Sequence, residues 1–206
     1  MPLSAWLDRV FRSPRWDEVD IWALDLETTG LRPDRDEILS VGMVPIRQGV
    51  IRYGDRFHSF VRPPDQAGLS TEGIRAHHLV PADYAAAPRV EDLVPEVESR
   101  LRGRVLLVHF APLDLAFLEA AFARAGRAWP APVVLDTVEL LLKEHHRKHR
   151  FSPHPPQSRT GLGEARAAAG LPAYPGHDAL SDALATAELF LLLRSRLGLC
   201  TLRALR

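Results

Sequence analysis

Two acidic residues lie two positions apart in an otherwise apolar segment near the N-terminus. Asp25 and Glu27 belong to the segment Asp20–Glu27, whose alternating pattern is typical of a β-strand. Side chains two positions apart on a strand share one face, so both carboxylates point the same way. Two buried like charges need a compensating cation, and oxygen ligands suit Mg²⁺ or Mn²⁺. A lone pair of this kind also fits a solvated strand edge, but Thr28-Thr29-Gly30 adds a polar turn that can approach a phosphate.

Three further residues are candidates for chemistry because of where they fall in predicted elements. Asp114 is expected in the first turn of a helix, where a carboxylate also serves simply to favour the helix N-terminus. Asp182 is expected in the first turns of the last helix, which Asp178 caps. His177 converges with Asp182 only if it belongs to the preceding loop, because five positions on one helix diverge by about 140°. From that loop a histidine can act as a general base, and a helix cap is the alternative.

A mixed α/β fold is expected to position these side chains. The first three strands form an antiparallel meander, and the later strands alternate with helices, which indicates a mixed sheet flanked by helices. Strands are expected at 20–27, 37–46, 50–61, 105–109 and 133–136, and helices at 71–79, 90–102, 112–126, 137–147, 160–169 and 178–197.

The expected domain organisation is an N-terminal extension (1–18), one domain (19–197) and a C-terminal tail (198–206). The apolar spacing of Trp6, Leu7, Val10 and Phe11 suggests a short amphipathic helix that packs on the domain or contacts a partner.

Composition sets bounds on the function. Lys plus Arg equal Asp plus Glu at 26 each, so the chain has no net charge. Any attraction of phosphate must therefore come from local groups or bound metal. This balance suits a small-molecule enzyme as well as a nuclease. Cys200 is the only cysteine, and the chain has neither a long apolar run nor a secretory signal. We therefore expect a cytoplasmic protein that does not contact a membrane.

Together, three segments resemble the DEDDh exonuclease superfamily of the ribonuclease H-like fold, and within it the proofreading type, the epsilon subunit of bacterial DNA polymerase III. The segments are Asp25–Gly30, His109–Asp114 and His177–Ala183, and the resemblance spans residues 19–194. It implies an α/β fold with a mixed five-stranded sheet. It also implies a 3′→5′ exonuclease that uses two Mg²⁺ or Mn²⁺ ions to release nucleoside monophosphates. The substrate implied is a single-stranded 3′ end, of DNA rather than RNA, and a DNA polymerase is the implied partner.

The resemblance also implies roles for individual residues. The residues that would bind metal are the carboxylates Asp25, Glu27, Asp114 and Asp182. His177 would be the general base. Thr28 and His109 would contact the substrate. A plain core position is the alternative for His109. The second segment departs from the family's usual His-Asn-x-x-Phe-Asp, because Phe110 and Leu113 replace the Asn and the Phe. This departure puts the local loop geometry and substrate contacts in doubt.

Two alternatives to a DNA exonuclease stay open. One is an exoribonuclease acting on RNA 3′ ends, and the other is a catalytically silent nucleic-acid-binding module that accompanies a polymerase.

The basic, histidine-rich segment 145–159 is expected to be a loop, either solvated or in contact with phosphate. Its histidine spacing matches no standard zinc ligand pattern.

Overall fold

The chain folds around a mixed six-stranded sheet. The structure, a computed structural model, describes residues 13–64, 81–154, 156–174 and 178–206. The central strand β1 pairs antiparallel with β2 on one side and parallel with β5 on the other, in the order β3-β2-β1-β5-β6, with β4 also paired to β2. The strands are β1 (Ile21–Thr28), β2 (Ile38–Arg47), β3 (Val50–Ile51), β4 (Phe57–Phe60), β5 (Val105–Val108) and β6 (Val133–Asp136).

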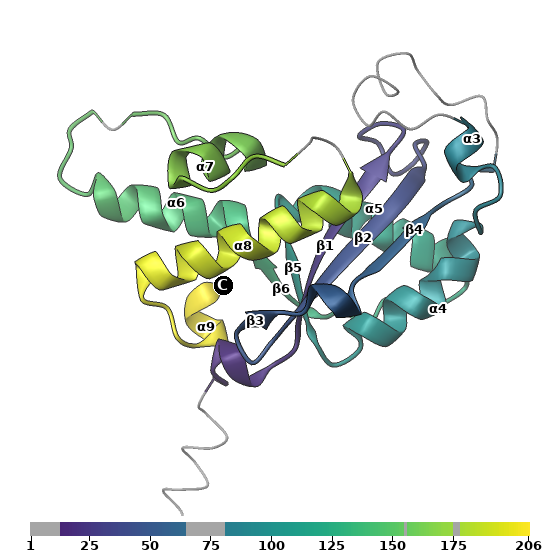
Figure 1. Cartoon of the computed structure of the whole chain (residues 1–206), viewed down its shortest axis with the longest axis horizontal. Helices are drawn as coiled ribbons and strands as arrows, with labels where there is room; N and C mark the ends of the chain where they lie inside the picture. The colour runs from purple at the N-terminus through teal and green to yellow at the C-terminus, as the bar shows by residue number, and fades with distance from the viewer. Residues whose placement is uncertain (1–12, 65–80, 155, 175–177) are drawn as a thin grey trace, which may run out of the picture.

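Helices cover both faces of this sheet (Figure 1). The α-helices are α3 (Pro81–Tyr84), α4 (Val90–Leu101), α5 (Ala111–Arg124), α6 (Thr137–Lys148), α7 (Leu162–Ala169), α8 (Ala179–Leu197) and α9 (Leu202–Leu205). Two 3₁₀ turns, η1 (Trp16–Glu18) and η2 (Tyr53–Asp55), precede β1 and β4. The long helix α8 crosses one face of the sheet, and α5 lies behind the other face.

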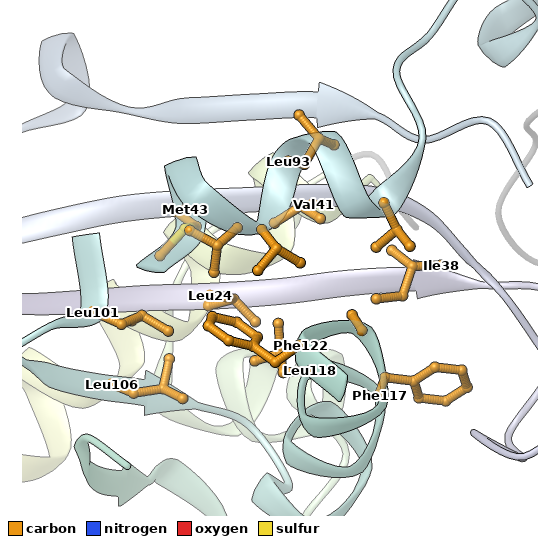
Figure 2. Close-up of a cluster of buried hydrophobic side chains, with 14 of the residues drawn as sticks. Leu24, Ile38, Val41, Met43, Leu93, Leu101, Leu106, Phe117, Leu118 and Phe122 are labelled. Carbon is orange, nitrogen blue, oxygen red and sulfur yellow. The ribbon is translucent and has the colours of Figure 1, made fainter. Parts of the chain in front are cut away.

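One hydrophobic core fills the space between the sheet and helices α4 and α5. Leu24 and Leu106 point from β1 and β5 toward Leu118 and Phe122 of α5, and α4 closes the same cluster (Figure 2). Because side chains alternate along a strand, Trp22 and Leu24 enter this core, while Ile21 and Ala23 face the other way. The alternation assigns each residue of β1 to a face, including the acidic residues that follow.

The second core lies under α8 and includes both ends of the described chain. Ile21 and Ala23 pack there with Phe190 and Leu193 of α8. Residues near the two termini join them: Trp16 lies edge-on to Phe190 with ring centroids 5.9 Å apart, and Leu202 and Leu205 of α9 are buried. Arg15 also forms a β-bridge with Thr201. Residues 13–18 and 199–206 therefore pack on the domain in this structure, whereas residues 1–12 of the expected extension lie outside the described residues.

The sequence-based fold class is confirmed, and two local expectations are corrected. The segment 50–61 was expected as one strand, but η2 divides it into β3 and β4, which pair with separate parts of β2. The segment 145–159 was expected as a loop, but its first four residues belong to α6, which continues to Lys148. The helix expected at 71–79 lies outside the described residues. Among the helices in the described ranges, none has the length and apolar character needed to cross a membrane.

Candidate metal and catalytic site

Three carboxylates converge near the end of β1. Asp25, Glu27 and Asp182 each offer an oxygen, and these oxygens all lie within 4.8 Å of one another. Ile21 and Ala23 face α8, so strand alternation places Asp25 and Glu27 on that same face. Asp182 comes from the first turn of α8. β1 pairs with β5 over Ile21–Ala23 only, so its acidic residues lie beyond the end of β5, at the end of the sheet where α5 begins.

Gly42 allows α8 to come close enough for this convergence. In the β1–β2 ladder Gly42 is the partner of Asp25. A Cβ built on Gly42 would lie 2.2 Å from the carbonyl carbon and oxygen of Ala179 and 2.3 Å from the nitrogen of Leu180. These are backbone atoms of the first turn of α8, so the helix rests directly on the strand. The missing side chain at position 42 therefore sets the distance from Asp182 to β1.

Asp178 fixes the start of α8 as the sequence predicted. One of its oxygens accepts hydrogen bonds from the backbone nitrogen of Ser181 at 3.0 Å and from its hydroxyl at 2.7 Å. The other oxygen lies 3.9 Å from Nε2 of His58 on β4, whose ladder partner is Gly42. The cap thus orients the helix whose first turn carries Asp182.

The segment before Asp178 is anchored by a buried arginine. The Arg166 guanidinium donates to the carbonyls of Ala185 and Pro172 and to Glu188, at 2.8–2.9 Å. Tyr174 donates its hydroxyl to the other oxygen of Glu188 at 2.9 Å. His177, the candidate general base, lies outside the described residues. Its described neighbours on both sides are held in place, by Tyr174 upstream and by the Asp178 cap downstream.

Asp114 is a buried fourth carboxylate near the cluster. It lies in the first turn of α5, directly after β5, and is 6% exposed. The three mutually close oxygens do not include one from Asp114. Its charge is nevertheless the strongest neighbouring influence on the pKa of Asp25, exceeded only by the effect of burial. Asp114 therefore lies within electrostatic reach of the three carboxylates.

Asp136 holds the turn that leads to Asp114, and sequence reasoning missed this residue. Its carboxylate accepts hydrogen bonds from the backbone nitrogens of Phe110 at 3.0 Å, Ala111 at 2.8 Å and Val138 at 2.8 Å. The last bond caps α6, and the other two hold the start of α5. The sequence Asp-Thr-x-Glu signals a helix cap, but the bonds to a turn 25 residues away had no local signal. Asp136 therefore joins the N-termini of two helices at the site.

His109 is bonded through both of its ring nitrogens. Nδ1 lies 2.7 Å from the hydroxyl of Thr137, and Nε2 lies 2.7 Å from the carbonyl oxygen of Thr160. A carbonyl only accepts, so Nε2 carries the proton, while the Thr137 hydroxyl that contacts Nδ1 also donates to the carbonyl of Val108 at 3.3 Å. Burial lowers the pKa of His109, against raising effects from the Thr160 carbonyl and from Asp136, which favours the neutral form of the ring. These contacts support the structural alternative for His109, which joins β5, α6 and the segment before α7.

Thr28 closes the turn that follows the acidic pair. Its hydroxyl donates to the carbonyl of Gly30 at 2.6 Å. Thr29 and Glu37 then hold the loop by two hydrogen bonds, one between backbones and one to the Thr29 hydroxyl, each 2.9 Å long. The Thr28 oxygen keeps its capacity to accept a further bond. Its role as a substrate contact stays a prediction.

The environment of the cluster disfavours negative charge. Burial, followed by the charges of Asp114, Asp182, Glu27 and Asp178, raises the pKa of Asp25 well above its ordinary value. Burial, then Asp182 and Asp178, raises the pKa of Glu27 to about 7. Burial and then Asp136 raise the pKa of Asp114 to about 8. The pKa values are raised because burial removes water from the ionised carboxylates and neighbouring carboxylates repel their charge.

This donor set fits a divalent cation. All of its ligands are carboxylate oxygens, which Mg²⁺ and Mn²⁺ prefer over softer ligands. A bound cation would remove the electrostatic cost that raises these pKa values. The candidate ligands are therefore Asp25, Glu27 and Asp182, with Asp114 beside them.

Comparisons with known proteins show the family of this chain. The profile of the RNase_T family, described as Exonuclease, matches residues 22–190. A DNA polymerase III subunit epsilon-like protein of Rhodobacter capsulatus is 32% identical over 85% of this chain and 24% of its own length. A PolC-type DNA polymerase III of Thermotoga petrophila is 30% identical over 82% of this chain and 11% of its own length. The chain thus spans a quarter or less of these two relatives.

Solved structures share the fold at low sequence identity. The zinc-bound complex of Escherichia coli ExoI with single-stranded DNA superposes with a TM-score of 0.74 and 17% identity, covering 87% of this chain and 41% of that one. Cell-death related nuclease 4 (CRN-4) gives a TM-score of 0.72 and 17% identity, covering 89% of this chain and 66% of that one. These likenesses concern the fold.

The contact at Gly42 leads to a first prediction. Gly42→Ala should lower the free energy of unfolding by about 1–3 kcal/mol, because the added methyl group overlaps helix backbone that cannot rotate away. It should also weaken Mn²⁺ binding, because α8 must move and carry Asp182 with it. Thermal denaturation and calorimetric Mn²⁺ titration measure the two effects. Gly54→Ala is the matched control, since a Cβ there meets nothing within 4 Å. Unchanged Mn²⁺ affinity in Gly42→Ala would contradict this role.

The raised pKa values lead to a second prediction. Without metal, the folded protein holds protons on Glu27 up to about pH 7 and on Asp114 up to about pH 8, whereas the unfolded chain releases them near pH 4. The folded state therefore binds more protons in this window, and stability should fall as pH rises from about 4 to 8. Mg²⁺ should raise the melting temperature more at pH 8 than at pH 5, because protons compete with the ion at low pH.

Thermal denaturation in EDTA and in Mg²⁺ at both pH values tests this linkage. Asp25→Asn is the control, because it removes the carboxylate that the other charges surround, and it should reduce the gain from Mg²⁺ at pH 8. An equal Mg²⁺ effect at the two pH values would show that the buried carboxylates do not bind the ion.

Proposed function

We propose that this chain, which belongs to the RNase_T exonuclease family, is a metal-dependent 3′→5′ exonuclease acting on single-stranded DNA 3′ ends. The observation that carries the proposal is the convergence of Asp25, Glu27 and Asp182 beside Asp114 at one edge of the sheet. A binding module has no need of four carboxylates gathered in one place, three of which, Asp25, Glu27 and Asp114, have pKa values raised by burial and by neighbouring negative charge. The products proposed are nucleoside monophosphates.

The proposed site residues have two roles, metal binding and proton transfer. Asp25, Glu27, Asp114 and Asp182 would hold two Mg²⁺ or Mn²⁺ ions. When bound, such ions supply positive charge beside the phosphate and make an attacking water more acidic. We assign His177 the role of accepting the proton of that water, since a neutral imidazole is a suitable base near neutral pH. The water oxygen forms a bond to phosphorus, the bond to the 3′-oxygen breaks, and that oxygen gains a proton.

The preference for DNA rests on the named relatives. Two of them carry DNA polymerase III names, and ExoI is bound to single-stranded DNA. A DNA polymerase is accordingly the proposed partner. The exoribonuclease alternative predicts the same site chemistry and differs only in the sugar of the substrate.

The proposed activity has a direct test. The protein should release mononucleotides from 5′-labelled single-stranded DNA as a ladder shortened from the 3′ end, with Mg²⁺ or Mn²⁺ but not with EDTA. Matched RNA should be degraded more slowly. Faster RNA degradation would favour the exoribonuclease alternative. Binding without cleavage under every metal condition would favour the catalytically silent module.

Two substitutions separate the proposed roles. Asp182→Ala and His177→Ala should each slow cleavage at least ~100-fold, the usual scale for losing a general base. Asp182→Ala removes a proposed metal ligand, and His177→Ala removes the proposed base itself. Asp182→Ala should also weaken Mn²⁺ binding, whereas His177→Ala should leave Mn²⁺ binding nearly intact. Asp34→Ala is the control, because Asp34 is an exposed carboxylate paired with Arg32. Near-normal rates in both variants would overturn the role assignment.

A further inference from the structure

Phe110 presents an aromatic ring to solvent beside the carboxylate site. It lies between β5 and α5, and 53% of its surface is exposed. It precedes Asp114 by four residues, which is about 6 Å of helix rise. Its neighbours Ala111 and Leu113 pack against the core between the sheet and α5, whereas the Phe110 ring does not belong to that cluster. Core packing therefore does not explain an aromatic ring at this position.

The backbone of Phe110 is strained and firmly held. Its φ of 73° and ψ of 67° lie in the left-handed region, which bulky side chains rarely adopt and where asparagine is favoured. The strain is balanced by the Asp136 carboxylate, which accepts hydrogen bonds from the nitrogens of Phe110 and Ala111. The ring is thus carried by a rigid turn. Strain of this kind that the surrounding structure maintains is a feature of functional sites.

The chemistry of the proposed substrate fits such a ring. A chain with no net charge gains little from general attraction to the phosphate backbone. Stacking of a base on an aromatic side chain needs no charge and tolerates any base. Such a contact suits an exonuclease that removes every nucleotide in turn, because it does not depend on which base is present.

We propose that Phe110 is a stacking platform for a nucleobase at or next to the 3′ end of the bound strand. The inference rests on the proposed function and adds the contact that holds the base while the carboxylates act on the phosphate. Phe110 is in this view a positioning residue that holds one base of the strand end, and a base next to the end can reach the ring only after it leaves the base stack, which favours single strands.

The test compares oligothymidylate with copies that lack one base at the terminal, penultimate or third position from the 3′ end. Binding is measured by fluorescence anisotropy with Ca²⁺ in place of Mg²⁺, to slow cleavage. For the wild-type protein, loss of the base at one of these positions should weaken binding about 5- to 100-fold. For Phe110→Asn, the intact and base-free strands should bind within about twofold of each other. Phe110→Tyr should behave like the wild type.

Two controls separate stacking from folding. Phe110→Asn should melt at the same temperature as the wild type or higher, because asparagine tolerates the left-handed backbone. Phe151→Asn removes another exposed aromatic ring, which lies past the far end of α6, about 18 Å of helix from Thr137. It should keep the full dependence on the missing base.

The outcomes distinguish the two proposals. A wild-type protein that neither binds nor cleaves the strands would refute the proposed function. A wild-type protein that binds and cleaves, with the same loss on base removal in Phe110→Asn, would refute the stacking role alone. Phe110→Tyr behaving like Phe110→Asn would refute it as well, because the property required is aromaticity.

Discussion

The repulsion among buried carboxylates is the constraint on which the rest of the site depends. Asp25 lies buried on the central strand; burial raises its pKa, and the charges of Asp114, Asp182 and Glu27 raise it further. Groups that repel one another do not gather unless the backbone holds them together. The fold supplies this restraint through contacts that involve backbone atoms, which cannot rotate away as side chains can. A divalent cation bound among these carboxylates would offset their mutual repulsion.

Two helices place carboxylates beside β1, and a different set of contacts fixes the position of each helix. α8 lies directly on β2 because Gly42 has no side chain, and the Asp178 cap sets the direction of its first turn. α5 begins from a strained turn whose nitrogens are bound by Asp136. Asp136 also caps α6, so one carboxylate accepts hydrogen bonds at the starts of two helices. Its negative charge contributes to the raised pKa of Asp114, after burial.

Local patterns predicted most of the elements and the acidic pair, because period and capping signals act over a few residues. Asp25 and Glu27 share a face by strand geometry alone, and the cap at Asp178 follows from its residue type. The contacts of Gly42 with α8 and of Asp136 with the Phe110 turn join residues distant in sequence, and no local signal specifies them. The division of 50–61 at η2 follows from its pairing with separate parts of β2, which only the folded sheet defines.

The balanced charge of the chain now has a physical interpretation. Several arginines are engaged within the fold: Arg47 and Arg104 pair with Asp20, and Arg124 pairs with Glu37. Their charge is partly neutralised, so it adds little to a general field that would attract nucleic acid. In the proposed function, a cation held by the carboxylates would place positive charge only where the phosphate must lie, and the exposed ring of Phe110 would hold the base without charge. This arrangement explains how a protein with an acidic site and no net charge could bind a polyanion. Its specificity for the strand end would come from the site itself and not from the charge of the whole surface.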